Sequence, residues 1–155
     1  MSEEFIFEAS FKVDSIETAS KLEEVIECIE LHDIEEARDA LPLSLLLKAE
    51  QRMEELTSAK SEYKNGTCLI SMAADTYDSC VTEMQISFDE ASLSGVITIE
   101  GHDHEADDLC ASMVLLLIAV GASRITAHGS SPDWSGHWFS TTSGELQFDF
   151  NCEPA

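Results

Sequence analysis

Two histidines and four acids lie together at positions 102–108, and they are the residues of this chain best suited to chemistry. The stretch reads His-Asp-His-Glu-Ala-Asp-Asp and follows an expected strand. Imidazole nitrogens and carboxylate oxygens bind zinc and other divalent ions. His102, His104 and Asp107 are therefore the candidate metal ligands, and a small metal-dependent hydrolase centred on His102 and His104 is one hypothesis for the function.

The same stretch has a structural interpretation, which the rest of the sequence favours. Acids in the first turn of a helix cap its free backbone N–H groups and interact favourably with its dipole. The sequence contains no nucleotide-binding glycine loop, Gly-x-Ser-x-Gly motif or EF-hand loop. Arg124 is the only basic residue after position 64, so a phosphate or carboxylate substrate would meet few counter-charges. We therefore predict a protein that is not an enzyme, with no catalytic residue and no cofactor.

Two further histidines, His128 and His137, bear on the metal hypothesis. They flank a segment rich in glycine, serine and proline. They would complete a site with residues 102–108 only if the segment 129–136 folded back on itself. The sequence leaves this point open.

The net charge of the chain limits its partners. Its 155 residues include 31 acidic and 8 basic side chains, for a formal net charge of -23. Such a chain repels nucleic-acid phosphates and anionic membrane surfaces. Because 44% of the residues are hydrophobic, we expect it to fold rather than remain disordered. The predicted partner is a basic protein surface, with no direct binding of nucleic acid or membrane.

The acids are unevenly distributed along the chain. Residues 1–64 hold 17 acids and 7 bases, whereas residues 65–155 hold 14 acids and one base. On the helix expected over 14–31, three glutamates fall on one ridge, with a rise of about 6 Å between the first two. Like charges at this spacing destabilise a helix by about 0.2–0.5 kcal/mol per pair, so stability alone does not explain them. The acids predicted to bind the partner are Glu23, Glu24, Glu27, Glu30, Asp33, Glu35, Glu36, Asp39, Glu50, Glu54, Glu55, Asp103, Glu105, Asp107 and Asp108.

Both tryptophans lie in one segment, 130–138, beside turn residues and an acid. Tryptophan is enriched among the residues that contribute most to protein–protein affinity. Trp134 and Trp138 are therefore candidate apolar anchors for the partner. The alternative is that they close one end of the core.

These features favour inhibition of a basic partner. DNA carries one charge per about 1.7 Å of its axis, and carboxylates along helix ridges match part of that pattern. The predicted function is occupation of the cationic surface of a nucleic-acid-binding protein or nuclease. Such an inhibitor would be a nucleic-acid mimic of the anti-defence type or, by the same logic, a toxin-neutralising immunity protein.

Two other interpretations stay open beside the inhibitor. In the first, the negative charge only keeps the protein dissolved, as acidic surfaces commonly do. In the other alternative, the chain is a structural subunit, for example of a homodimer, that buries its apolar segment 109–120 in an oligomer interface.

Hydrophobic periodicity assigns these residues to secondary-structure elements. Asp14 and Glu17 have the spacing of a helix cap, Pro42 suits the first turn of a helix, and Gly121 suits a helix end. Strands are expected at 5–13, 67–73, 81–88, 93–100, 124–127, 137–142 and 145–150. Helices are expected at 14–31, from Pro42 to Tyr63 after an acidic connection over 32–41, and at 103–122.

Together these elements predict a single acidic α+β domain over residues 1–155. Helices pack on one mainly antiparallel sheet, in the order β-α-α-βββ-α-βββ. The acidic N-terminus does not resemble a signal peptide and no segment has the about 20 apolar residues that span a bilayer, so we expect a cytoplasmic protein. The cysteines form no Cys-x-x-Cys pair and are predicted to be reduced, buried thiols; they are Cys28, Cys68, Cys80, Cys110 and Cys152.

Overall fold

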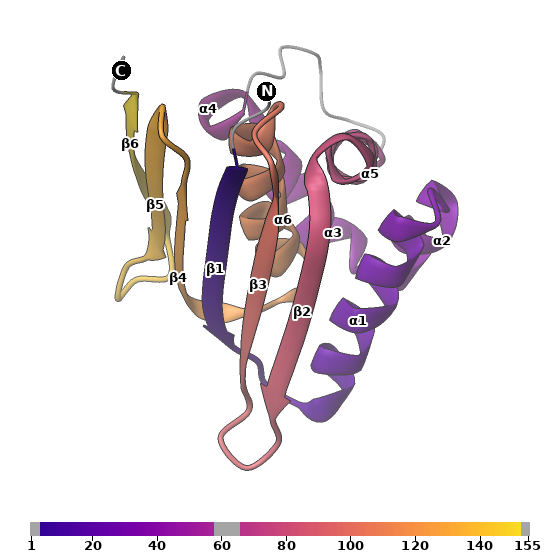
Figure 1. Cartoon of the computed structure of the whole chain (residues 1–155). Coiled ribbons are helices and arrows are strands. Elements are labelled where there is room, and N and C mark those ends of the chain that lie inside the picture. The colour runs from indigo at the N-terminus through magenta and orange to yellow at the C-terminus, as the bar shows by residue number, and fades with distance from the viewer. Residues whose placement is uncertain (1–3, 58–65, 153–155) are drawn as a thin grey trace.

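A six-stranded antiparallel sheet forms the centre of the fold. The computed structural model describes residues 4–57 and 66–152, and within them the chain forms six strands and six helices (Figure 1). The strands lie in the order β2-β3-β1-β4-β5-β6. Their bounds are β1 Glu4–Lys12, β2 Val81–Asp89, β3 Ser94–His102, β4 Ser123–Ser130, β5 Trp134–Ser140 and β6 Leu146–Cys152. The helices are α1 Ile16–Glu30, α2 Ile34–Ala40, α3 Leu43–Glu50, α4 Met53–Leu56, α5 Cys68–Cys80 and α6 Ala106–Val120.

The helices cover one face of the sheet and leave the other face to solvent (Figure 1). Strand β1 shows the reason, because Phe5, Phe7, Ala9 and Phe11 are buried while the residues between them are exposed. Alternate side chains of a strand point to opposite faces, so the period-two pattern fixes which face meets the helices. The predicted α+β class, with helices packed on an antiparallel sheet, is confirmed.

The connectivity contains two split β-α-β units. Strands β1 and β2 are joined through α1–α5 and are separated in the sheet by β3, and α6 joins β3 to β4 on the far side of β1. This is the β-α-β-β-α-β arrangement of ferredoxin-like folds, and many unrelated functions share it. The hairpin β5–β6 extends the sheet beyond β4. The topology therefore does not itself indicate a function.

Helix α6 is the core of the molecule. Thirteen of its fifteen residues are buried, as its uniformly apolar sequence predicts. It packs against α3 and α5 on one side and against the sheet on the other. The prediction that segment 109–120 lies in an oligomer interface is therefore wrong, because the chain itself covers that segment.

Helix α5 replaces a predicted strand. Residues 67–73 were expected to form a strand, but Leu69, Ile70, Ala73 and Ala74 are buried at helical spacing. The start of α5 depends on Glu50, whose Oε2 accepts the N–H of Leu69 at 3.0 Å and whose Oε1 accepts that of Gly66 at 3.2 Å. This cap comes from α3, so the local sequence does not reveal it.

The long helix predicted from Pro42 to Tyr63 is also wrong in part. Helix α3 ends at Glu50, the chain turns at Gln51 and Arg52, and α4 is a single turn. The hydroxyl of Thr57 donates to the Met53 carbonyl at 2.7 Å, and the extended backbone of Thr57 ends α4. Tyr63 lies outside the described residues.

Two predictions near α1 need smaller corrections. The N-cap of α1 is Ser15 rather than Asp14, and its hydroxyl accepts the N–H of Thr18 at 3.3 Å. The expected connection over 32–41 contains α2, whose N-cap Asp33 accepts the N–H of Glu36 at 3.4 Å. The acids of this connection are thus held on a helix.

The remaining elements agree with the sequence. Gly121 ends α6 with a φ of 96°, and Gly144, with a φ of 87°, turns the β5–β6 hairpin. Cys28, Cys80 and Cys110 are buried free thiols and Cys68 is partly buried, whereas the side chain of Cys152 lies outside the described residues. Within the described residues, none of the helices has the length and apolar character needed to cross a membrane.

Candidate functional site

Eight exposed carboxylates lie on α1, on α2 and in the turn between them. We call them the acidic surface. Buried residues such as Leu22, Val25 and Ile29 fix one side of α1 to the core, which leaves the other side for the acids. Helix α2 packs against α1 and α5, so the two helices present their acids together. The members are Glu23, Glu24, Glu27, Glu30, Asp33, Glu35, Glu36 and Asp39.

Four of these acids are close enough to perturb one another. The pKa of Glu36 is raised by a hydrogen bond with the Asp33 carboxylate, by the charge of Asp33, by slight desolvation and by the charges of Glu24 and Glu27. The pKa of the buried Cys28 thiol is raised first by burial and then by the same four carboxylates. The centre of the acidic surface is therefore a region of unrelieved negative potential.

The cations near the acidic surface compensate little of its charge. Arg38 Nη2 lies 3.7 Å from Asp39 Oδ1, and the Asp39 side chain is 74% exposed. Exposed pairs of this kind contribute about 0–1 kcal/mol. The only other ion pairs among the described residues join His32 to Asp78 and Arg52 to Glu55. None of these three ion pairs includes any of the four central acids, which are Glu24, Glu27, Asp33 and Glu36.

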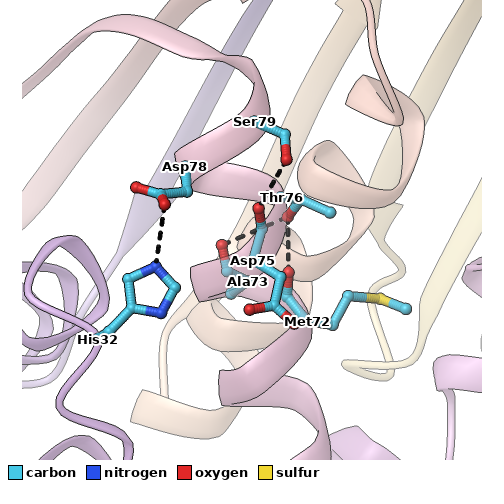
Figure 2. Close-up of polar contacts among 7 residues, drawn as sticks. All are labelled: His32, Met72, Ala73, Asp75, Thr76, Asp78 and Ser79. Carbon is cyan, nitrogen blue, oxygen red and sulfur yellow. Dashed lines mark hydrogen bonds and ion pairs between the residues drawn. The ribbon is translucent and has the colours of Figure 1, made fainter.

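Helix α5 extends the negative region beyond α1 and α2. Figure 2 shows the His32 ring directed at Asp78, with 3.6 Å between Nε2 and Oδ2, and Asp75 one turn earlier on α5. Tyr77 lies on the same helix, and its pKa is raised to about 12 by burial, by the charge of Glu30 and by a hydrogen bond with Glu30. Asp75 and Asp78 are both exposed, so they add to the field of the acidic surface.

An apolar side chain, Leu31, interrupts the acids at the end of α1. It is 72% exposed, more than any other large hydrophobic residue described. The turn around it is well defined, because the N–H of Leu31 donates to Glu27 and that of Asp33 donates to Cys28. The local sequence does not distinguish Leu31, since a leucine at the end of an amphipathic helix normally belongs to the core.

Several predicted partner-binding residues have structural roles instead. Glu50 is fully buried as the cap of α5, and Asp108 is 7% exposed. Asp103 Oδ1 accepts the indole N–H of Trp134 at 3.1 Å. Trp134 and Trp138 are 7% and 2% exposed, so they close the core and are not exposed anchors. These predictions failed because of tertiary contacts that the local sequence does not show. They bury Glu50, Asp108 and both tryptophans, and they bind the half-buried Asp103 to Trp134.

The other predicted acids are separate from the acidic surface. Glu54 and Glu55 are exposed on α4, Glu105 is exposed at the N-cap of α6, and Asp107 is half-buried in its first turn. Helix α4 packs on α6, and α4 lies away from α1 and α2 (Figure 1). The fifteen acids predicted from sequence therefore do not form one continuous surface.

The candidate metal ligands do not converge. His102 and His104 are exposed, and Asp107 is half-buried. No group of three or more histidine, cysteine, aspartate or glutamate side chains suited to a metal ion occurs among the described residues. The backbone carbonyl of His104 accepts a hydrogen bond from the Cys80 thiol, which ties this turn to the end of α5.

The segment 129–136 does fold back, and its Trp134 contacts Asp103, but among the described residues this does not gather His128 and His137 into a metal site with residues 102–108. Strands β4 and β5 form a hairpin that places His128 directly opposite His137 on the open face of the sheet. Glu8 lies opposite His128 on β1, and Asp149 lies opposite His137 on β6. All four line a shallow groove of about 670 Å³. The pairing of these residues results from the strand register, which the local sequence does not specify.

A comparison of the chain with protein-family models, curated proteins and solved structures gave no match.

Proposed function

We propose that the protein acts by binding, and that its acidic surface occupies the cationic, nucleic-acid-binding surface of another protein and blocks it. The observation that supports this most directly is the set of eight exposed carboxylates on α1, on α2 and in the turn between them, where Arg38–Asp39 is the only ion pair of these acids among the described residues. The raised pKa of Glu36 agrees with this crowding, and its causes are first a hydrogen bond with Asp33 and then the charge of Asp33, desolvation and the charges of Glu24 and Glu27. A basic partner would supply the missing cations.

The spacing of the acids suits a partner that binds phosphates. Glu23 and Glu27 are one helical turn apart, with a rise of about 6 Å. DNA presents phosphates along two strands at comparable separations, and its partners carry lysine and arginine at matching positions. Charges of opposite sign also steer the two proteins together and increase the association rate.

Leu31 supplies the apolar contact that a purely charged surface lacks. Residues at the centre of an interface contribute most when neighbouring contacts exclude water from them. Glu30 and Asp33 flank Leu31 and would form such a polar rim. Leu31 thus takes the anchoring role that the sequence had suggested for Trp134 and Trp138.

A basic, nucleic-acid-binding partner is expected in two biological settings, and the protein would bind it in the same way in both. An anti-defence inhibitor would block a DNA-binding protein, and an immunity protein would neutralise a nuclease toxin. Cys28, Cys80 and Cys110 are free thiols, which is usual in the reducing cytoplasm. We therefore propose that the protein and its partner are cytoplasmic.

The experiment uses two variants with the same net charge. One replaces Glu24, Glu27 and Glu36 by glutamine and Asp33 by asparagine. The control replaces four exposed acids on strands, Glu8, Glu83, Glu100 and Asp149, by the corresponding amides. Proteins that bind the wild-type chain at low salt are captured from cells that express it, and each dissociation constant is measured by calorimetry.

We expect the first variant to lose at least tenfold in affinity for a basic nucleic-acid-binding partner, and the control to lose less than threefold. The nuclease or DNA-binding activity of that partner should be inhibited by the wild type and the control alone. Equal losses in the two variants would show that only net charge matters, and this would refute a specific surface.

A further inference from the structure

A small pocket lies where α4, the first turn of α6 and the hairpin β5–β6 meet. Its volume is about 280 Å³, at the lower end for ligand pockets and therefore suited to one side chain. Strand β6 forms one edge of the sheet, and α1 and α2 lie toward the opposite edge (Figure 1). The pocket is thus separate from the acidic surface. The residues that define it are Glu55, Asp107, Asp108, Trp138, Phe148 and Phe150.

Two phenylalanine rings give the pocket an accessible aromatic wall. Phe148 is 41% exposed and Phe150 is 38% exposed, although apolar side chains of this size are usually buried. Phe150 is held in place by Trp134, whose ring stacks on it with 5.7 Å between centroids. A planar cation such as guanidinium stacks favourably on a fixed aromatic face.

A carboxylate beside this wall lacks a cation. Asp107 forms no ion pair with any described residue, and it is half-buried. Its pKa is raised by burial and by the Asp108 carboxylate, and it is lowered in part by backbone N–H groups of Asp107 and Asp108. Arg52, the N-cap residue of α4, is already bound to Glu55 at 3.3 Å and to the Leu146 carbonyl at 3.0 Å.

Trp138 lines the same pocket and is 2% exposed. Its indole nitrogen is the one buried side-chain polar atom without a partner among the described residues, and it is too deeply buried to bond to a ligand in the pocket. The pocket therefore offers a ligand one carboxylate and an aromatic wall. The guanidinium of an arginine side chain matches both.

We propose that this pocket binds an arginine side chain of a polypeptide, with the guanidinium between Asp107 and the rings of Phe148 and Phe150. This site goes beyond the proposed function, because it does not require the acidic surface. A lysine side chain also carries a cation, but it lacks the planar group that stacks on the rings.

The test uses acetyl-Gly-Arg-Gly-amide and the full chain. Binding is followed by tryptophan fluorescence, since Trp138 lines the pocket and Trp134 stacks on its wall. The matched peptide contains citrulline, which keeps the shape of arginine and removes its charge. We expect saturable binding of the arginine peptide, with binding at least tenfold weaker for the citrulline peptide and at least threefold weaker for the lysine peptide.

Two variants test the residues separately. Asp107→Asn should weaken binding of the arginine peptide at least tenfold, and Phe148→Leu should weaken it at least threefold. The matched control is Asp149→Asn, an exposed aspartate on the open face of the sheet, which should leave binding unchanged. Circular dichroism and the unfolding midpoint identify a variant that has simply failed to fold, and the other variant then decides.

Several results would overturn the proposal. One is the absence of saturable binding of the arginine peptide to the folded wild type. Another is equal binding of the arginine and citrulline peptides, and a third is unchanged binding by both folded variants. Equal binding of the lysine peptide would refute the assignment to guanidinium. None of these results bears on the acidic surface, whose variants leave the pocket intact.

Discussion

The acidic surface and the pair Glu50 and Asp103 show two uses of a carboxylate. On α1 and α2 the carboxylates are exposed and repel one another, as the raised pKa of Glu36 indicates. Glu50 on α3 and Asp103 in the turn before α6 are instead hydrogen-bonded within the fold, where Glu50 caps α5 and Asp103 accepts the indole N–H of Trp134. The amino-acid composition does not distinguish the exposed carboxylates from those bonded within the fold. Only their surroundings show which acids stabilise the protein and which are free for a partner.

Because of this difference, neutralising the two kinds of carboxylate should change the stability of the fold in opposite directions. Removing the charge of a buried, hydrogen-bonded carboxylate leaves backbone donors unsatisfied and destabilises the fold. Removing an exposed carboxylate from a crowded set relieves repulsion and stabilises the fold. The predictions below use this contrast, beginning with the largest expected effect.

The largest effect is expected at Glu50. Replacing it by alanine removes both acceptors for the N–H groups of Gly66 and Leu69 and leaves them buried. We expect the free energy of unfolding, measured by urea denaturation, to fall by about 2–4 kcal/mol. The control is Glu54→Ala on the exposed side of α4, which should change it by less than about 0.5 kcal/mol. Similar losses in both variants would contradict the capping role.

A smaller loss is expected at Asp103. Asp103→Ala removes the acceptor of the Trp134 indole N–H, a bond of 3.1 Å to a carboxylate. We expect a loss of about 1–2 kcal/mol in urea denaturation, because solvent can reach this half-buried bond. The fluorescence of Trp134 should also change. Glu105→Ala, at the exposed N-cap without a side-chain cap bond, is the control and should have little effect.

Neutralising the centre of the acidic surface should have the opposite sign. At low salt, the variant with amides at positions 24, 27, 33 and 36 should have a higher melting temperature than the wild type, by on the order of a few degrees. The gain should shrink in about 0.5 M salt, where the Debye length falls below about 5 Å. A variant that melts below the wild type at both salt concentrations would show that these acids stabilise the fold.

The smallest effect is a dependence of stability on pH. The pKa of Glu36 is raised above its usual 4.5, and that of Asp107 is raised above 3.8. The folded chain binds these protons more tightly than the unfolded chain, so stability should rise as the pH falls from 7 toward 5. Urea midpoints at the two pH values measure this rise, and it should be smaller for Glu36→Gln. An unchanged rise in that variant would exclude Glu36 as a source.

Much of the fold follows from local patterns. The alternation of β1, the amphipathic pattern of α1 and the uniformly apolar sequence of α6 each identified an element and its buried side. Helix α5 was missed because its β-branched and small residues resemble a strand and its cap is Glu50. The cap lies 16 and 19 residues from the two N–H groups that it accepts, so no local window contains it.

The candidate site shows the same limit. The exposed acids of α1 and α2 follow from helical spacing, because residues opposite a buried stripe face solvent. The burial of Trp134, Trp138 and Asp108 does not, because it depends on how the β5–β6 hairpin meets α6. Leu31 was missed for the converse reason, since its exposure results from the turn that ends α1.

The most direct test of the central claim is site-specific photo-crosslinking in cells. A photoreactive residue replaces Leu31 in one variant and Ile6, which is 59% exposed on the open sheet face, in the other. The account predicts crosslinking of a basic nucleic-acid-binding protein from position 31 and none from position 6, with the product lost when positions 24, 27, 33 and 36 carry amides. A partner that crosslinks from position 6, or from position 31 regardless of those four charges, would contradict it.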